Sequence, residues 1–276
     1  MKFTKMHGIG NDYVYIDCFK ETVKDPQALA VKWSDRHKGI GGDGVILIMP
    51  SDKADFRMRM FNADGSEGKM CGNGTRCVGK YVYDRGLTDK TEITLETLSG
   101  IKYLTLHPEN GKVRSVTVDM GLCSFRPQDI PIKSGSPLVK APLEVCGKNW
   151  DITCVSMGNP HCVIFTDSID SMPLEQIGPQ FENHPLFPER VNTEFVETVD
   201  STHLKMRVWE RGSGETMACG TGACATVAAA VKCGICAEDT PVTVSLLGGD
   251  LEITCSGGRL LMTGPAEIVF DGEIKE

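Results

Sequence analysis

The 276-residue sequence lacks the features that mark membrane, secreted and nucleic-acid-binding proteins. No apolar run approaches the roughly 20 residues that a helical membrane span requires. The opening MKFTKMHGIGNDYVY has neither the apolar segment nor the small-residue cleavage site of a secretory leader. Asp and Glu outnumber Lys and Arg by 37 to 29, and this acidic balance argues against a nucleic-acid surface. We therefore expect a soluble cytoplasmic protein with no membrane or nucleic-acid partner.

Metal-ligand spacing is also missing. None of the histidines at positions 7, 37, 107, 184 and 203 stands at such a spacing from another ligand. Twelve cysteines are present, but they are spread along a mid-sized chain, and most are expected to be reduced and buried. Cys233 and Cys236 in CGIC have redox or zinc spacing, yet no second pair accompanies them, which favours a structural role. The sequence predicts no metal site.

Short alternating and β-branched segments predict a chain rich in strands. They occupy residues 2–6, 13–17, 45–49, 56–61, 92–98, 101–106 and 113–119, and then 151–155, 161–166, 205–209, 242–247, 251–255 and 259–263. Turn signals such as ENGK, LSG, LLGGDL and CSGGRL join several of them. Helical patterns are fewer, at residues 26–35, 74–84, 174–183 and the Ala-rich 222–233. Mostly antiparallel sheet around a few helices indicates an α+β fold. The Pro- and Ser-rich residues 125–142 are a linker or a loop.

An internal repeat organises the chain. Cys71, in KMCGNGTRC, and Cys219, in MACGTGACA, stand 148 positions apart, and so do Asn11 and Asn159. The same offset pairs Phe61 with Trp209, Glu67 with Glu215, Gly72 with Gly220 and Gly74 with Gly222. Two homologous halves are therefore predicted, each bringing one cysteine at a helix start to a shared cleft.

Two cysteines so placed suit proton exchange. The N-terminus of a helix presents backbone N–H groups and the positive end of the helix dipole, which are expected to lower the pKa of a thiol. The glycines that follow let the same N–H groups approach a carboxylate closely. A thiolate could remove the proton from one face of the carbon next to that carboxylate while a thiol protonates the opposite face. For a reach of roughly 3–3.5 Å per sulfur, the two sulfurs would lie about 6–7 Å apart.

These motifs resemble those of diaminopimelate epimerase. The segments FNADGSEGKMCGNGTRC, GNPH, VNTEFV and WERGSGETMACGTGACA carry the resemblance, together with the opening FTKMHGIGNDYVYID, and it covers essentially the whole chain. The resemblance implies inversion of one α-carbon, interconverting LL- and meso-2,6-diaminopimelate in lysine biosynthesis, without a cofactor or metal. It also implies two pseudo-symmetric halves, each a barrel-like sheet around a central helix, with the active cleft between them.

The resemblance assigns a role to each matching residue. Cys71 and Cys219 become the acid/base thiols, with Cys71 the proton donor and Cys219 the acceptor in one direction. Two further residues, His161 and Glu210, tune these thiols. The reacting carboxylate is held by backbone amides of Gly72, Asn73, Gly220 and Thr221. The rest of the substrate is bound by Asn11, near the reacting amino group, by Glu210, at the distal ammonium, and by Asn62, Asn159, Asn192 and Arg211, at the distal carboxylate.

The resemblance also sets expectations for the larger organisation. The first half covers residues 1–120, joined by a C-terminal strand within 264–276, and the second half covers residues 121–263. A homodimer is expected. One position departs from the family pattern: Gly44 stands where some members carry a glutamine that contacts substrate.

Two other functions remain open from the sequence. A proline or hydroxyproline racemase uses the same two-cysteine chemistry, although the Glu210–Arg211 pair has no purpose for a small ring substrate. A non-catalytic relative or a thiol redox protein, in which Cys71 and Cys219 form a regulatory disulfide, is the alternative from another class. GTGACA also fits a dinucleotide-binding glycine motif, but it follows a polar stretch rather than a strand of a βαβ unit.

Overall fold

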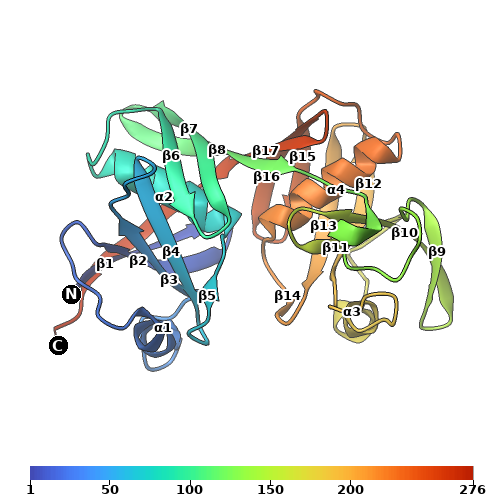
Figure 1. Cartoon of the computed structure of the whole chain (residues 1–276), viewed down its shortest axis with the longest axis horizontal. Helices are drawn as coiled ribbons and strands as arrows, with labels where there is room; N and C mark the ends of the chain where they lie inside the picture. Colours follow the sequence, from blue (N-terminus) through green and yellow to red (C-terminus); the bar gives the residue numbers. More distant parts are fainter. Residues whose placement is uncertain (276) are drawn as a thin grey trace. The chain divides into compact units, whose positions relative to one another are not determined.

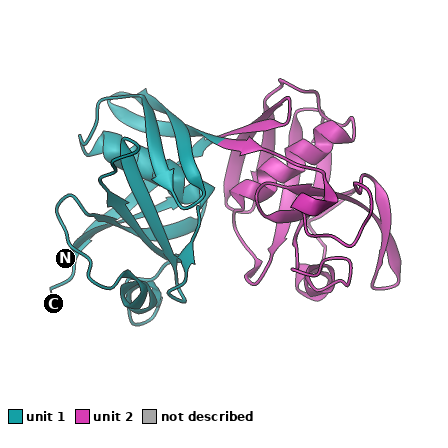
Figure 2. Ribbon diagram, viewed as in Figure 1, with its two compact units in different colours: residues 1–119, 263–276 teal, residues 120–262 magenta. Residues whose placement is uncertain are grey.

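A computed structural model describes residues 1–275, and the chain forms two compact units (Figure 2). Unit 1 contains Met1–Asp119 and the C-terminal stretch that starts at Thr263, and unit 2 contains Met120–Met262. No helix among the described residues is long and apolar enough to cross a membrane.

Unit 1 is a mostly antiparallel sheet with two helices (Figure 1). The sheet runs in the order β18, β1, β2, β3, β4, β6, β7, β8, and its parallel pairs are β2 with β3 and β4 with β6. The helix α2 packs against β1, β2 and β7, whereas α1 packs against β3 and β4. The elements are β1 (Lys2–Gly8), β2 (Asn11–Asp17), α1 (Pro26–Ser34), β3 (Gly44–Met49), β4 (Phe56–Asn62), β5 (Glu67–Gly68), α2 (Gly72–Asp84), β6 (Glu92–Thr97), β7 (Gly100–Glu109), β8 (Lys112–Leu122) and β18 (Glu267–Glu273).

Unit 2 repeats this plan. The helix α4 packs against β10, β11, β12, β13 and β16, while α3 packs against β9, β12, β13 and β14. Its parallel pairs are β11 with β12 and β13 with β15. The elements are the single 3-10 turn η1 (Pro127–Asp129), β9 (Ala141–Val145), β10 (Lys148–Ser156), β11 (Pro160–Thr166), α3 (Leu174–Glu182), β12 (Asn192–Asp200), β13 (His203–Glu210), β14 (Gly214–Glu215), α4 (Gly220–Lys232), β15 (Val242–Leu246), β16 (Gly249–Ser256) and β17 (Arg259–Pro265).

The offset of 148 residues holds for whole elements. Helix α1 begins at residue 26 and α3 at residue 174, while α2 begins at residue 72 and α4 at residue 220. The strand register follows the same rule: β2 aligns Tyr13 with Gly44, and β11 aligns His161 with Asn192. The prediction of an α+β fold with two repeated halves is therefore confirmed.

An ion pair is repeated as well. In unit 1 the guanidinium of Arg59 donates to both carboxylate oxygens of Glu67, at 2.7 and 3.0 Å. In unit 2 Arg207 contacts Glu215 in the same two-pronged way, again at 2.7 and 3.0 Å. The first pair joins β4 to β5, and the second joins β13 to β14. The short strand that precedes the cysteine is therefore held in the same way in both units.

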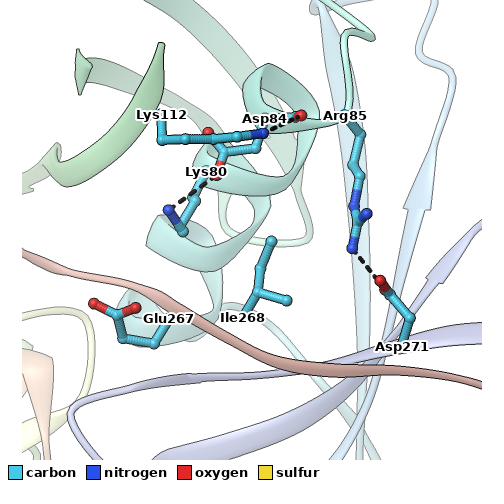
Figure 3. A pocket seen from close by; sticks show the side chains of 7 residues that line it. All are labelled: Lys80, Asp84, Arg85, Lys112, Glu267, Ile268 and Asp271. Carbon is cyan, nitrogen blue, oxygen red and sulfur yellow. Dashed lines mark hydrogen bonds and ion pairs between the residues drawn. The ribbon is translucent and has the colours of Figure 1, made fainter. Parts of the chain in front are cut away.

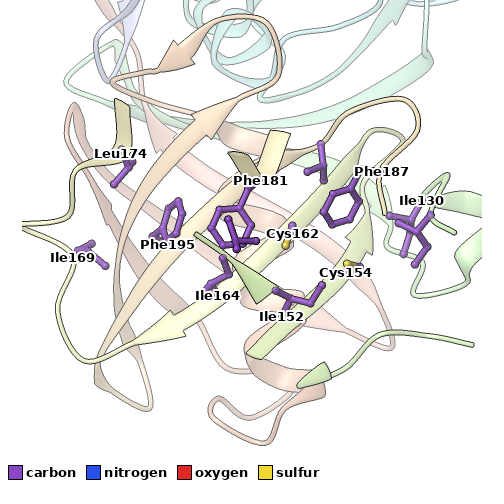
Figure 4. Close-up of a cluster of buried hydrophobic side chains, with 13 residues drawn as sticks. Ile130, Ile152, Cys154, Cys162, Ile164, Ile169, Leu174, Phe181, Phe187 and Phe195 are labelled. Carbon is purple, nitrogen blue, oxygen red and sulfur yellow. The ribbon is translucent and has the colours of Figure 1, made fainter. Parts of the chain in front are cut away.

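Each unit has its own apolar core. In unit 1, Phe3 on β1 packs against Trp33 on α1 with ring centroids 5.6 Å apart. In unit 2, Phe181 on α3 packs edge-on against Phe195 on β12, with centroids 5.5 Å apart (Figure 4). These clusters join α1 to the sheet of unit 1 and α3 to the sheet of unit 2. The opposite face of each sheet is then left for α2 in unit 1 and for α4 in unit 2.

Besides the two-residue strands β5 and β14, the sequence patterns did not predict two longer strands, β9 and β12. The first five residues of β12 are all buried, with Phe195 in the core cluster and Glu194 beneath α4. A strand covered on both faces loses the alternation on which the prediction relied. The strand β9 pairs with β10 and contains Pro142, a residue that signals a loop. Residues 125–142 lie within unit 2 and bury Ile130 in its core, so they form a packed loop, not a linker.

The contact between α3 and β13 leads to a stability prediction. A Cβ atom on Gly178 would lie 2.3 Å from Cδ2 of the Trp209 indole. We expect Gly178→Ala to lower the free energy of unfolding by about 1–3 kcal/mol, because overpacking forces the ring to move. Urea denaturation measures this change. The control is Gly135→Ala, where a Cβ meets nothing within 4 Å. Equal stability of the two variants would contradict the assigned contact.

Candidate active site in two clusters

Cys71 caps the N-terminus of α2. Its sulfur accepts a hydrogen bond from the backbone N–H of Gly74 at 3.4 Å, which is the N-cap arrangement. Gly72 and Asn73 form the start of the helix, where backbone N–H groups point toward its N-terminal end. A side chain at Gly74 would meet Cδ1 of Ile46 at 2.6 Å, so glycine is needed for the helix start to approach the sheet.

An asparagine with a fixed orientation lies beside this thiol. The amide nitrogen of Asn11 donates to Asp43 at 2.7 Å, so its oxygen faces Cys71. That oxygen accepts from the Cys71 thiol at 3.2 Å and from the side chain of Asn73 at 3.3 Å. Arg36 donates to the second oxygen of Asp43 at 3.0 Å and holds this carboxylate in place. We call Asn11, Asp43, Cys71 and Asn73 the Cys71 cluster.

Cys219 caps α4 in the same way. Its sulfur accepts from the backbone N–H of Gly222 at 3.3 Å, and Gly220 and Thr221 form the helix start. A Cβ atom at Gly222 would lie 2.9 Å from Oε1 of Glu194 and 3.2 Å from the sulfur. Glycine is therefore needed here too, although the residue beneath it is a glutamate rather than Ile46.

The surroundings of Cys219 are polar and buried. Thr221 Oγ1 lies 3.6 Å from the sulfur and accepts from the amide nitrogen of Asn159 at 3.3 Å. The oxygen of Asn159 lies 3.1 Å from Nε2 of His161. Nδ1 of the same imidazole lies 2.6 Å from Glu194, and both of these side chains are fully buried. We call Asn159, His161, Glu194, Cys219 and Thr221 the Cys219 cluster.

The expected low pKa is wrong for Cys219. Burial raises the pKa of this thiol well above its usual value, and the charges of Glu210 and Glu194 raise it further. Hydrogen bonds from Thr221 and from the backbone of Gly222 act in the opposite direction but are weaker. The helix N-terminus therefore does not determine the ionisation of Cys219 by itself. Burial destabilises the thiolate by more than the N–H groups of the helix start stabilise it.

The remaining predicted residues of unit 2 lie along the strands next to this cluster. Asn192, at the start of β12, donates to the carbonyl of Pro160 at 2.9 Å and accepts from the backbone of Arg211 at 2.9 Å. The guanidinium of Arg211 donates to the carbonyl of Glu189 at 2.9 Å. Glu210 accepts from the hydroxyl of Thr216 at 2.5 Å.

Two positions of unit 1 lie opposite each other on the antiparallel pair of β3 and β4. Asn62, the last residue of β4, donates to the hydroxyl of Ser66 at 3.0 Å. Gly44 begins β3 and leaves no space for a side chain, because a Cβ there would lie 2.0 Å from the carbonyl oxygen of Phe61. The residue of unit 2 that corresponds to Gly44 is Asn192. Only unit 2 therefore has a side chain at this repeated position.

Unit 1 also contains a cavity of about 370 Å³ (Figure 3). Four of its charged side chains form ion pairs: Lys80 lies 2.9 Å from Asp84, and Arg85 lies 2.6 Å from Asp271. Lys80 also donates to the carbonyl of Val113 at 2.6 Å. None of the residues of the Cys71 cluster lines this cavity. These pairs attach α2 to β8 and β18, which is a structural role.

Sequence reasoning missed Glu194 and Asp43. Glu194 lies in VNTEFV and Asp43 lies directly before Gly44, but neither acidic residue has an acidic partner at the 148-residue offset. The offset places Ile46 opposite Glu194, and this contrast of a charge with an apolar residue was the available signal. The same offset places the apolar Val191 opposite Asp43, so Asp43 carried this signal too, although its contact with Asn11 forms only in the folded loop.

The fold is shared with solved structures that are named as a racemase, an epimerase and a phenazine biosynthesis protein. The structure matches a probable proline racemase from Agrobacterium radiobacter with a TM-score of 0.71 and 14% identity, over 99% of this chain and 92% of that one. It matches a hydroxyproline epimerase from Agrobacterium vitis with a TM-score of 0.70 and 15% identity, over 99% and 90%. A phenazine biosynthesis protein of the PhzF family from Bacillus anthracis gives 0.69 and 18%, over 100% and 99%.

Sequence comparison narrows this class to one family. The diaminopimelate epimerase profile matches residues 3–125 and 153–269. Diaminopimelate epimerase of Acetivibrio thermocellus is 57% identical over 99% of this chain and 98% of its own length. The enzymes of Agathobacter rectalis and Methanococcus maripaludis are 56% and 53% identical, each over 99% of both chains. The chain belongs to the diaminopimelate epimerase family.

The charge of Glu210 gives a testable effect on Cys219. Because this carboxylate raises the pKa of the thiol, Glu210→Gln should lower that pKa. The thiolate fraction at a given pH then rises, and the midpoint of the alkylation rate against pH moves to lower pH. Iodoacetamide labelling, resolved by peptide mass spectrometry, measures the midpoint for this cysteine. Glu197→Gln, at an ion pair with Lys205, is the control and should leave the midpoint unchanged.

Proposed function

We propose that this protein interconverts LL- and meso-diaminopimelate by inverting one α-carbon with two thiols. Membership of the family and identities of 53–57% over nearly the whole chain support the reaction and the substrate. The single observation that carries the chemistry is the repeated N-cap: a cysteine sulfur stands at the start of the central helix in both units. In this proposal each unit supplies one thiol to the same α-carbon.

The two thiols exchange one proton each with the substrate. The Cys219 thiolate takes the α-proton from one face, and the Cys71 thiol gives its proton to the other face. The C–H bond that breaks and the C–H bond that forms involve the same carbon, so the net result is inversion. In the reverse direction the two sulfurs exchange roles. The intermediate carbanion-like charge spreads into the α-carboxylate, which the amides of the helix starts would stabilise.

The substrate groups are assigned by charge and hydrogen bonding. The amides of Gly72, Asn73, Gly220 and Thr221 hold the reacting carboxylate, and Asn11 lies near the reacting amino group. At the distal end, Glu210 binds the ammonium, while Asn62, Asn159, Asn192 and Arg211 bind the carboxylate. His161 tunes Cys219. The contact of Asn11 with Cys71 at 3.2 Å and the contacts joining Asn159, His161 and Thr221 support these roles.

Replacement of each cysteine tests the two-thiol scheme. We expect Cys71→Ala and Cys219→Ala each to lower the rate of epimerisation by at least about 10²–10⁴-fold, since each removes one acid/base group. The conversion of LL- to meso-diaminopimelate is followed by chiral chromatography, and circular dichroism verifies that the variants fold. Either single variant retaining wild-type turnover would refute the scheme.

The same assay separates the two alternatives left by the sequence. Racemisation of proline in place of diaminopimelate would favour the proline racemase reading. Absence of any turnover under reducing conditions, together with a Cys71–Cys219 disulfide under oxidising conditions, would favour the redox reading. We expect turnover of diaminopimelate only.

We further propose that the enzyme acts in the cytoplasm as a homodimer. All twelve cysteines are free, which suits a reducing compartment. Large apolar side chains are exposed on β18 of unit 1, where Val269 is 54% and Phe270 46% accessible, and an interface would bury them.

The dimer proposal is tested by mass in solution. Light scattering should give twice the 30.0 kDa of the chain. Val269→Asp should shift the particle toward the monomer mass, because an interface would bury the new charge. The matched control is Val31→Asp on α1, where the side chain is 52% accessible. A monomeric wild type, or equal effects of both variants, would contradict the proposed interface.

A further inference from the structure

A continuous row of polar groups leads from a buried glutamate to the sulfur of Cys219. Glu194 on β12 meets Nδ1 of His161 on β11 at 2.6 Å, and Nε2 of that ring meets the oxygen of Asn159 at 3.1 Å. The amide nitrogen of Asn159 donates to Thr221 at 3.3 Å, and the Thr221 hydroxyl lies 3.6 Å from the Cys219 sulfur. The row lies entirely within unit 2.

Burial fixes the number of protons on the first pair. His161 and Glu194 are both 0% exposed, and a lone carboxylate at this depth would be an uncompensated charge. The 2.6 Å contact requires one proton between Nδ1 and Oε1, because two acceptors do not bind each other. The contact with the oxygen of Asn159 requires a second proton on Nε2. The pair of His161 and Glu194 is therefore neutral overall. Nε2 is a donor whether the shared proton is on Nδ1 of His161 or on Oε1 of Glu194.

The orientation of Asn159 gives the row one direction. Its oxygen faces Nε2 of His161, and its amide nitrogen donates to Thr221. Thr221 Oγ1 receives that amide hydrogen, which leaves its own hydroxyl hydrogen to point at Cys219. A hydroxyl that donates to sulfur stabilises the thiolate over the thiol. Burial is the main influence on the pKa of Cys219 and raises it, while the Thr221 hydroxyl opposes this effect.

The Cys71 cluster presents the opposite end of the equivalent asparagine. Asp43 accepts from the amide nitrogen of Asn11, so the oxygen of Asn11 faces Cys71 and accepts from its thiol. This contact stabilises the protonated form of Cys71. The glutamate has no counterpart there, because the position 148 residues before Glu194 is Ile46. One thiol thus faces an acceptor and the other a donor.

We propose that Glu194 is a positioning residue for the Cys219 thiol, acting through His161, Asn159 and Thr221. The inference rests on the proposed function, in which Cys219 is one of the two acid/base thiols. Glu194 keeps the Thr221 hydroxyl directed at the sulfur, so that Cys219 is prepared to accept the α-proton while Cys71 holds one to donate.

The test compares this role with simple charge repulsion. The charged groups of unit 2 that face Cys219 are Glu194 and Glu210, and the negative charge of Glu194 alone would raise the pKa of the thiol. Glu194→Gln removes that charge, so repulsion predicts an alkylation midpoint at lower pH. The positioning role predicts a midpoint at higher pH, with about tenfold less thiolate at a fixed pH, because a glutamine amide can either donate to or accept from Nδ1 and so no longer fixes Nε2 of His161 as the donor.

Variants of Thr221 show whether the effect passes along the row. Thr221→Val removes the hydroxyl but keeps the backbone amide, and it should raise the midpoint as Glu194→Gln does. Thr221→Ser restores the hydroxyl and should return the wild-type midpoint. The double variant Glu194→Gln/Thr221→Val should show no more change than Thr221→Val alone. A lowered midpoint in Glu194→Gln, or additive effects in the double variant, would overturn the proposal.

A matched control excludes a general loss of structure. Glu182 is another buried glutamate of unit 2, bound to Arg190 and Trp209, and it makes no contact with the row. Glu182→Gln should leave the midpoint of Cys219 unchanged. If Glu194→Gln does not fold, the alkylation midpoints of Thr221→Val and Thr221→Ser still test the proposal. Equal midpoints in these two variants would overturn it.

The labelling experiment is independent of turnover. Iodoacetamide and peptide mass spectrometry report on Cys219 in the full chain without substrate, so the midpoints can follow the prediction even in a protein that does not epimerise diaminopimelate. That outcome would reject the proposed function and retain the positioning role. Normal epimerisation with a lowered midpoint in Glu194→Gln would reject only the positioning role.

Discussion

Both clusters depend on one interaction, the hydrogen bond from a helix N-terminus to a cysteine sulfur. Cys71 and Cys219 accept from the backbone N–H three residues ahead, at 3.4 and 3.3 Å. The bond holds each sulfur at the start of a helix that the sheet of its own unit supports. Gly74 and Gly222 allow this approach, since a Cβ atom at these positions would crowd the side chains of Ile46 and Glu194 on the strands below. Cysteine and glycine are therefore needed together.

The repeat gives the two cysteines equivalent positions in the two units. Residues that are not repeated give the two thiols different hydrogen-bond partners. Equivalent helices, strands and an arginine–glutamate pair recur at one offset. The asparagines also recur, but Asn11 is oriented by Asp43 and Asn159 by His161. The proposed two-thiol reaction needs one sulfur protonated and the other not, so identical surroundings would serve it poorly. Two similar units with different polar contacts around their cysteines are consistent with this proposal.

Sequence patterns predicted much of the fold and less of the site. The hairpin from β7 to β8 followed from ENGK, because Asn110 and Gly111 adopt the positive φ angles that such a turn requires. The strand β12 did not, because burial on both faces removes alternation. Cys71 and Cys219 could be recognised from repeated motifs. The raised pKa of Cys219 could not, since it depends on burial and on Glu210 and Glu194, which only the folded chain brings near it.

The central claim is that two different sulfurs serve the two faces of one carbon. The position of solvent deuterium in the earliest products tests it most directly. LL-diaminopimelate is incubated with the enzyme in D₂O, and substrate and product are separated and examined by mass spectrometry at low conversion. The account predicts one deuterium at the inverted α-carbon of nearly every product molecule and almost none in the remaining substrate. Product that retains the original hydrogen, or substrate labelled as fast as product forms, would show a single base and contradict the account.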